Sequence, residues 1–135
     1  MTGAPTPGAP PQPYQYAVLR VVPRVERAEF LNVGVVVFSR PLDFLDVRVE
    51  LDAELLARMA PACDVARVQA RLDGIVRVAH GDSGAGPIAR LTTSERFHWL
   101  VAPSSTVVQV SPAHTGTTTD PVAQLARLFE QLVAR

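Results

Sequence analysis

The sequence predicts an α+β domain: a mostly antiparallel sheet of about five strands with three helices packed on one face, in the order β-β-β-α-α-β-β-α. Two observations predict this class. Three strand-like segments follow one another before any helical pattern, and the helical patterns are segregated from them. The chain has 135 residues, of which 47% are hydrophobic and 19% charged, as expected for one globular core.

The N-terminal segment, residues 1–13, is rich in Pro and Gly, which predicts a disordered tail ahead of a single domain over residues 14–135. Residues 14–22 alternate between two faces and predict a strand that Pro23 ends. A charged bend, residues 24–30, follows this strand.

The next strand, residues 31–38, is almost continuously apolar, which is typical of a central strand covered on both faces. Gly34 inside it indicates a β-bulge or a close approach of another backbone. Residues 44–51 alternate cleanly, with Leu45 and Val47 on the apolar face, and predict a half-buried strand.

Aspartates mark the expected helix starts. Asp52 is a suitable N-cap for a short helix through Met59, and Asp64 for a second helix that His80 and Gly81 end. Apolar residues of the second helix form one stripe: Val65, Val68, Leu72, Ile75, Val76 and Ala79. Asp120 and Pro121 open the last helix in the same way.

Between these helices, the Gly-rich residues 81–87 predict a flexible connector. A phosphate-binding loop leaves a strand and opens a helix, whereas this segment leaves a helix and runs into Pro87. Residues 97–102 and 106–110 predict a hairpin around residues 103–105.

Composition excludes several classes of protein. The 13 basic residues are all Arg and are balanced by 13 acidic residues, which disfavours nucleic-acid binding through a bulk positive field. Without Lys, Schiff-base and phosphate-loop lysine chemistry is excluded. The single Cys63 excludes an intramolecular disulfide. No apolar run approaches a membrane span and no secretory signal is expected, so we expect a cytoplasmic protein that does not bind membranes.

The first polar cluster comprises Arg20, Arg24, Glu26, Arg27 and Glu29. A half-buried guanidinium at Arg20 needs a carboxylate, which Glu26 or Glu29 could supply by folding back. The cluster is therefore either an ion-pair clasp or a recognition site for a carboxylate, a phosphate or an acidic partner.

The second cluster combines His98 and Trp99 with His114 and Thr115. Two histidines and a distant Cys63 have no standard metal-ligand spacing, so we expect no metal and no cofactor. His114 and Thr115 are expected in an ordered loop, where ligand or partner contacts tend to occur. Neither cluster contains a recognisable catalytic constellation.

Two blocks of sequence carry a resemblance. Residues 14–38, YQYAVLRVVPRVERAEFLNVGVVVF, and residues 97–106, FHWLVAPSST, continued by Ser111, Pro112, His114 and Gly116, resemble the bacterial family catalogued as domain of unknown function 3037. The first block includes Asn32. The resemblance implies no established activity, but it implies a neighbouring kinase similar to the HipA toxin and hence a partner or modulator role.

The favoured hypothesis is a non-catalytic module that binds a protein partner, either a HipA-like kinase or a second copy of itself. The expected binding residues are Arg20, Arg24, Glu26, Glu29, Asn32, His98, Trp99, His114 and Thr115. The alternative is a small enzyme or ligand-binding protein in which Arg20, Glu29, His98 and His114 surround one pocket.

Overall fold

The computed structural model describes residues 8–103 and 106–135, and these form five strands and four helices. The elements are β1 (Gln12–Val21), β2 (Leu31–Ser39), β3 (Phe44–Val49), α1 (Ala53–Met59), α2 (Val65–Ala79), α3 (Thr93–Leu100), β4 (Val108–Val110), β5 (His114–Thr118) and α4 (Pro121–Leu132). The α+β class and the antiparallel sheet are confirmed. β1 begins at Gln12, inside the segment expected to be a disordered tail, while residues 1–7 of that segment lie outside the described residues.

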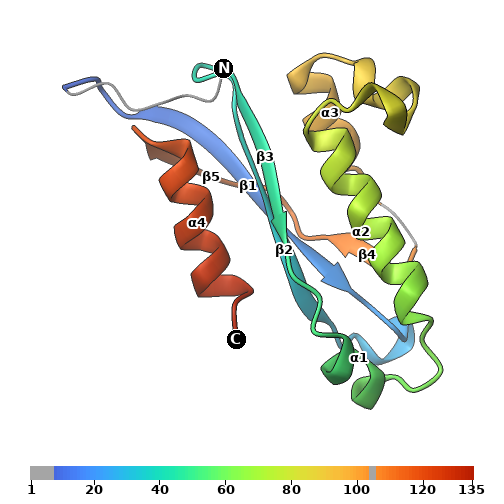
Figure 1. Cartoon of the computed structure of the whole chain (residues 1–135). Coiled ribbons are helices and arrows are strands. Elements are labelled where there is room, and N and C mark those ends of the chain that lie inside the picture. The colour runs from blue at the N-terminus through green and yellow to red at the C-terminus, as the bar shows by residue number, and fades with distance from the viewer. Residues whose placement is uncertain (1–7, 104–105) are drawn as a thin grey trace.

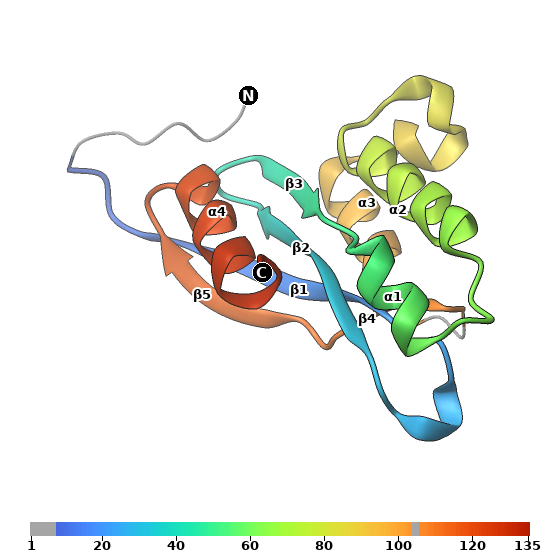
Figure 2. The same ribbon diagram turned by 60° about the horizontal axis from the view of Figure 1, so that its bottom comes forward.

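Strand β1 organises the sheet because it has neighbours along both of its edges (Figures 1 and 2). On one side lie β2 and then β3, both antiparallel to their neighbours. On the other side β4 pairs with residues 19–21 and β5 with residues 12–16. Buried Ser111 joins the two short strands: its N–H donates to the Val18 carbonyl, and its Oγ accepts from the Val18 N–H, both at 2.9 Å.

Helices cover both faces of this sheet, so the expectation of helices on one face is wrong (Figure 1). On one face, Val35 and Val37 of β2 pack in a cluster with Leu125 and Phe129 of α4. On the other face, further β2 side chains are buried with α2 and α3. A strand that is apolar on both sides requires two covers, which is why the nearly continuous apolar run over residues 31–38 forms a central strand, as predicted.

The structure confirms both features predicted at Gly34, a β-bulge and a close approach of another backbone. Leu19 is opposite Gly34 while Arg20 is opposite Asn32, so β2 carries one extra residue at this point. Val33 is this extra residue. The bulge shifts the alternation of β2 by one residue, because Leu31 before it and Val36 after it are buried in the same cluster. The bulge thereby keeps the apolar residues of both halves of the strand against the same helices.

The predicted N-caps are confirmed. Asp52, Asp64 and Asp120 each accept a hydrogen bond from the backbone N–H three residues later, at 3.0–3.1 Å. Such caps satisfy backbone donors that the first turn of a helix leaves unpaired. The Gly-rich segment, residues 81–87, is a connector that contains a short 3-10 turn, Ser83–Ala85.

Two predictions for the C-terminal half are wrong. Residues 97–100, expected to begin a hairpin, belong to α3, while residues 104–105 of its expected turn lie outside the described residues. Helix α3 starts with a capping box in which the Thr92 side chain accepts from the Glu95 N–H and Glu95 accepts from the Thr92 N–H. The segment around His114, expected to be a loop, forms β5. Among the described residues the structure has the five strands that were predicted, and it has four α-helices where three were predicted.

Arg96 holds α3 against the end of α2. Its Nη1 donates to the carbonyls of Val78 and Ala79 at 3.1 and 2.6 Å, and its Nε donates to the Leu91 carbonyl at 3.1 Å. Its Nη2 donates to the Thr93 hydroxyl at 3.3 Å. A cation at this position satisfies carbonyls that the last turn of a helix leaves open and complements the helix dipole.

We therefore expect Arg96→Ala to reduce the free energy of unfolding by about 2–3 kcal/mol, because the carbonyls lose charge-assisted hydrogen bonds. Urea unfolding followed by circular dichroism measures the loss. Arg90→Ala is the matched control, since Arg90 is exposed and should change stability by less than about 0.5 kcal/mol. Equal effects of the two substitutions would contradict this role of Arg96.

Candidate functional site

The charged residues between β1 and β2 pair with one another rather than with Arg20. Arg24 Nε lies 3.0 Å from Glu26 Oε1, and Arg27 binds Glu29 in the same way. Hydrogen bonds from its own backbone N–H and from Arg24 lower the pKa of Glu26, and the hydrogen bond from Arg27 lowers the pKa of Glu29. Both shifts favour the ionised form of these carboxylates.

Arg20 finds an aromatic neighbour instead of the expected carboxylate. Its guanidinium lies 4.2 Å from the centroid of the Phe30 ring. Directly opposite on β2, Asn32 donates through Nδ2 to the Leu132 carbonyl at 3.1 Å. Arg20 Nε and Asn32 Oδ1 are buried and have no hydrogen-bond partner among the described residues. Asn32 thus ties the bulge of β2 to the end of α4, whereas Arg20 packs on Phe30.

The histidines of the second cluster lie on different layers. His98 is exposed on α3, where its Nδ1 lies 2.7 Å from the Ser94 carbonyl oxygen. His114 starts β5 and lies against the Tyr16 ring, with centroids 5.1 Å apart. Thr115 is an exposed member of the same strand, opposite Gln15.

The alternative prediction from the sequence is one pocket surrounded by Arg20, Glu29, His98 and His114. Within the described part of the chain, no hydrogen bond or ion pair joins any two of them. His98 belongs to the helical layer of α2 and α3, whereas Tyr16, against which His114 lies, packs with the α4 cluster. The arrangement provides no shared acid, base and nucleophile.

The two sequence blocks nevertheless meet in space. Phe97 stacks on Phe38 with ring centroids 4.7 Å apart, and the β4–β5 segment pairs with β1. These contacts are core packing and sheet pairing. The blocks therefore specify a common architecture.

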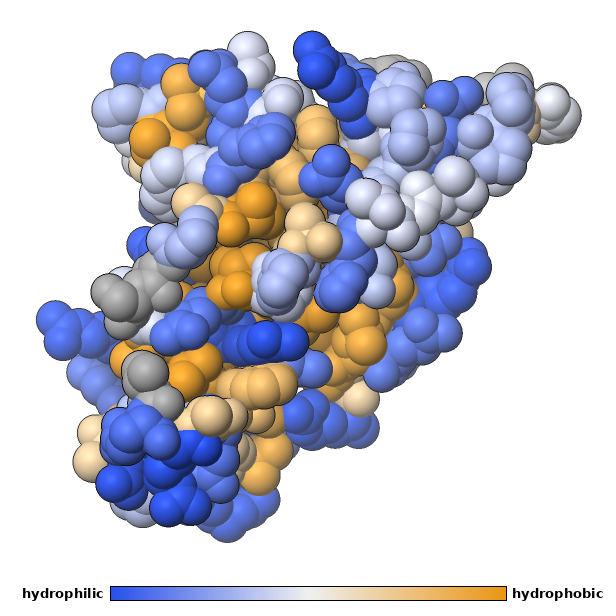
Figure 3. Space-filling model, turned by 180° about the vertical axis from the view of Figure 1, so that it is seen from behind, coloured by the Kyte–Doolittle hydropathy of each residue, from blue (hydrophilic) through white to orange (hydrophobic). Residues whose placement is uncertain are grey.

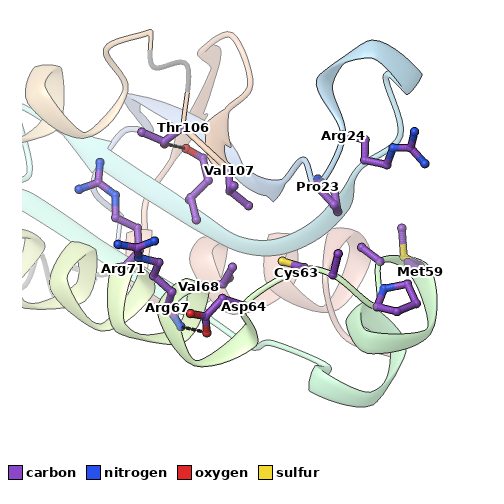
Figure 4. A pocket seen from close by; sticks show the side chains of 14 residues that line it. Pro23, Arg24, Met59, Cys63, Asp64, Arg67, Val68, Arg71, Thr106 and Val107 are labelled. Carbon is purple, nitrogen blue, oxygen red and sulfur yellow. Dashed lines mark hydrogen bonds between the residues drawn. The ribbon is translucent and has the colours of Figure 1, made fainter.

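A large hollow lies elsewhere, between β4 and the start of α2. We call it the β4 groove. It encloses about 830 Å³ and is lined by Pro23 and Arg24, by residues 59–64 with Arg67, Val68 and Arg71, and by residues 106–108. Figure 4 shows Cys63 and Val68 on the helical side, facing Val107 on the strand side. Three separate segments of the chain therefore build this site.

Apolar groups dominate the interior of the β4 groove. Val68 and Val108 are buried, whereas Met59 and Val107 keep 42% and 40% of their surface exposed. Seen from behind relative to Figure 1, the molecule shows a band of hydrophobic residues between hydrophilic margins (Figure 3). Exposed apolar side chains around a hollow are typical of a binding surface.

Among the described residues that line the β4 groove, the thiol and the carboxylate come from consecutive positions, Cys63 and Asp64. Burial, together with neighbouring Asp64, raises the pKa of the Cys63 thiol, which keeps it protonated and poorly nucleophilic at neutral pH. Asp64 Oδ1 accepts the Arg67 N–H at 3.1 Å as the helix cap. Across residues 8–103 and 106–135, no three His, Cys, Asp or Glu side chains gather closely enough to hold a metal ion.

Fold and site together define a small α+β protein with a sheet covered on both faces and an apolar groove at its β4 edge. The chain belongs to the family described as protein of unknown function (DUF3037), whose sequence model matches residues 16–133. No curated protein and no solved structure matches it. None of the helices in the described part of the chain is both long enough and apolar enough to cross a membrane.

Proposed function

We propose that this protein is a non-catalytic module that binds a segment of a partner protein in the β4 groove. The observation that supports it is the apolar groove itself, with Met59 and Val107 exposed beside it. Covering exposed apolar groups of this kind with a partner stabilises the complex by roughly 25 cal/mol per Å² of buried apolar surface.

The shape of the site favours a peptide segment. The β4 groove lies between a strand edge and a helix, and its volume accommodates several side chains. Interfaces commonly place a few large apolar anchors in such a hollow and surround them with polar residues. Arg67 and Arg71 on α2 provide such polar surroundings.

The first partner to test is a HipA-like kinase, which the family resemblance implies. A second copy of this chain fits the groove less well. In a symmetric dimer the same surface occurs on both subunits, so the Arg67 and Arg71 faces would meet each other. Self-association is therefore an outcome that the experiment must distinguish.

We expect co-expression with the neighbouring kinase, followed by size-exclusion chromatography with light scattering, to yield a heterocomplex. The Ala62→Trp side chain should fill the β4 groove and exclude the partner's apolar anchor. We expect the complex to weaken at least about tenfold, which corresponds to a loss of about 1.4 kcal/mol of binding free energy. Ala66→Trp is the matched control, because Ala66 is exposed on α2 outside the groove lining.

Three results would contradict the proposal. One is a strict monomer that never co-elutes with the kinase. Another is a complex that Ala62→Trp and Ala66→Trp affect equally. The third is a homodimer that forms through the groove in place of the heterocomplex.

A further inference from the structure

We infer that the segment bound in the β4 groove is acidic, with Asp or Glu side chains next to an apolar anchor. This inference rests on the proposed function and adds the chemistry of the partner. It depends on the charges that face the groove from α2, namely Arg67 and Arg71.

Neither of these arginines forms an ion pair within the described residues. The one carboxylate of the groove lining, Asp64, already serves as the N-cap of α2. Arg24, at the other end of the groove, already pairs with Glu26 and points away from α2 (Figure 4). The helical side of the groove therefore carries two arginines without an ion-pair partner against the single carboxylate of Asp64, which leaves a net positive charge there.

The spacing of Arg67 and Arg71 strengthens the argument. Residues four apart are neighbours on a helix surface, and like charges at this spacing destabilise the helix. Both side chains extend from α2 in the same direction (Figure 4). Arg71 also lies 6.0 Å from the centroid of the Trp99 ring, which is 38% exposed. A carboxylate placed between the two guanidinium groups would relieve their repulsion.

Arginine suits this role because its planar fork binds a carboxylate through two parallel hydrogen bonds. Buried Val68 follows Arg67 directly in α2, and Val108 lies across the groove, so apolar and cationic contacts are adjacent. A segment with an acidic side chain beside a large apolar one matches both contacts at once.

Panning a phage-displayed random twelve-residue library on the immobilised full chain tests the inference without any known partner. We expect enriched sequences to contain Asp or Glu together with a large apolar residue. They should be lost on the double variant R67E/R71E and retained on R58E/R90E, which changes two exposed arginines outside the groove and matches the change in net charge.

The best peptide, made synthetically, should bind at least about tenfold more weakly when NaCl is raised from about 50 to about 300 mM, because exposed charge pairs are screened by salt. R67E alone should abolish binding yet raise Tm by about 2 °C, since it places a carboxylate one turn before Arg71. A purely structural role of Arg67 would instead lower Tm.

Two outcomes would overturn the inference, and they are distinguishable. If neutral or basic peptides are enriched and Ala62→Trp abolishes their binding, the groove binds segments but not acidic ones, and the proposed function stands. If no enriched peptide is sensitive to Ala62→Trp, both the inference and the proposed function are wrong.

Discussion

Replacing Gly34 by Val should lower the free energy of unfolding by about 3 kcal/mol or more, a large part of the stability of a small domain. A Cβ atom at Gly34 would lie 2.9 Å from the Arg48 carbonyl oxygen and from Val49 Cγ1, and 3.1 Å from Leu19 Cδ1. The backbone of β2 cannot shift to relieve these contacts, because strands flank it on both sides and helices cover both faces.

Gly74 in α2 is the matched control for this prediction. A Cβ atom there meets nothing within 4 Å, and the residue lies in a helix interior. Gly74→Ala should therefore raise stability by about 0.5–1 kcal/mol, because alanine loses less backbone entropy in a helix than glycine. Urea unfolding curves give both values. An unchanged stability of Gly34→Val would show that the close approach at the bulge is unimportant, and a loss of stability in Gly74→Ala would contradict the free space found at that position.

Phe97→Ala should lower the free energy of unfolding by about 4 kcal/mol, as for other fully buried aromatic residues. The Phe97 side chain is 1% exposed and its ring stacks on Phe38, so its removal leaves a cavity between α3 and the sheet. Thermal unfolding and near-ultraviolet circular dichroism should both report the loss of packing.

The neighbour His98 supplies the control for Phe97. His98 is exposed, and its ring Nδ1 contacts the Ser94 carbonyl of its own helix. His98→Ala should therefore change the free energy of unfolding by less than about 1 kcal/mol. Similar effects of the two substitutions would argue against Phe97 as the link between α3 and β2.

Much of the fold follows from local sequence signals. Asp52, Asp64 and Asp120 mark helix starts because a carboxylate in that position satisfies backbone N–H groups whatever the surrounding fold. The continuous apolar run of β2 identifies the central strand for a similar reason, since such a strand must be covered on both faces. Helix capping and strand burial can therefore be predicted from the sequence without knowledge of the tertiary contacts.

The failure at α3 has an equally local cause. The apolar run after residue 96 is short and equally compatible with a strand, and the spacing of Phe97 and Trp99 suggested alternation. The capping box of Thr92 and Glu95 and the burial of Phe97 with Leu100, three residues apart, decide for the helix. The capping box was present in the sequence and is the signal that would have corrected the prediction.

The candidate site was predictable only in part. Sequence reasoning selected charged and aromatic residues, and the structure uses Arg24, Arg27 and Asn32 in local pairs or in backbone contacts. The β4 groove instead combines apolar residues of three distant segments, and no spacing in the sequence shows that they converge. The exposure of Met59 and Val107 becomes visible only when the tertiary structure is known.

The position of β1 between early and late strands has a consequence for biosynthesis. Val18 forms its hydrogen bond with Ser111, which is synthesised 93 residues later, and Asn32 forms its hydrogen bond with Leu132, which is synthesised 100 residues later. At ordinary translation speeds of about 5–20 residues per second, roughly 5–20 s separate the appearance of these partners on the ribosome. During that interval the nascent chain exposes an open strand edge and one uncovered apolar face, which are the features that make incompletely folded chains prone to aggregation.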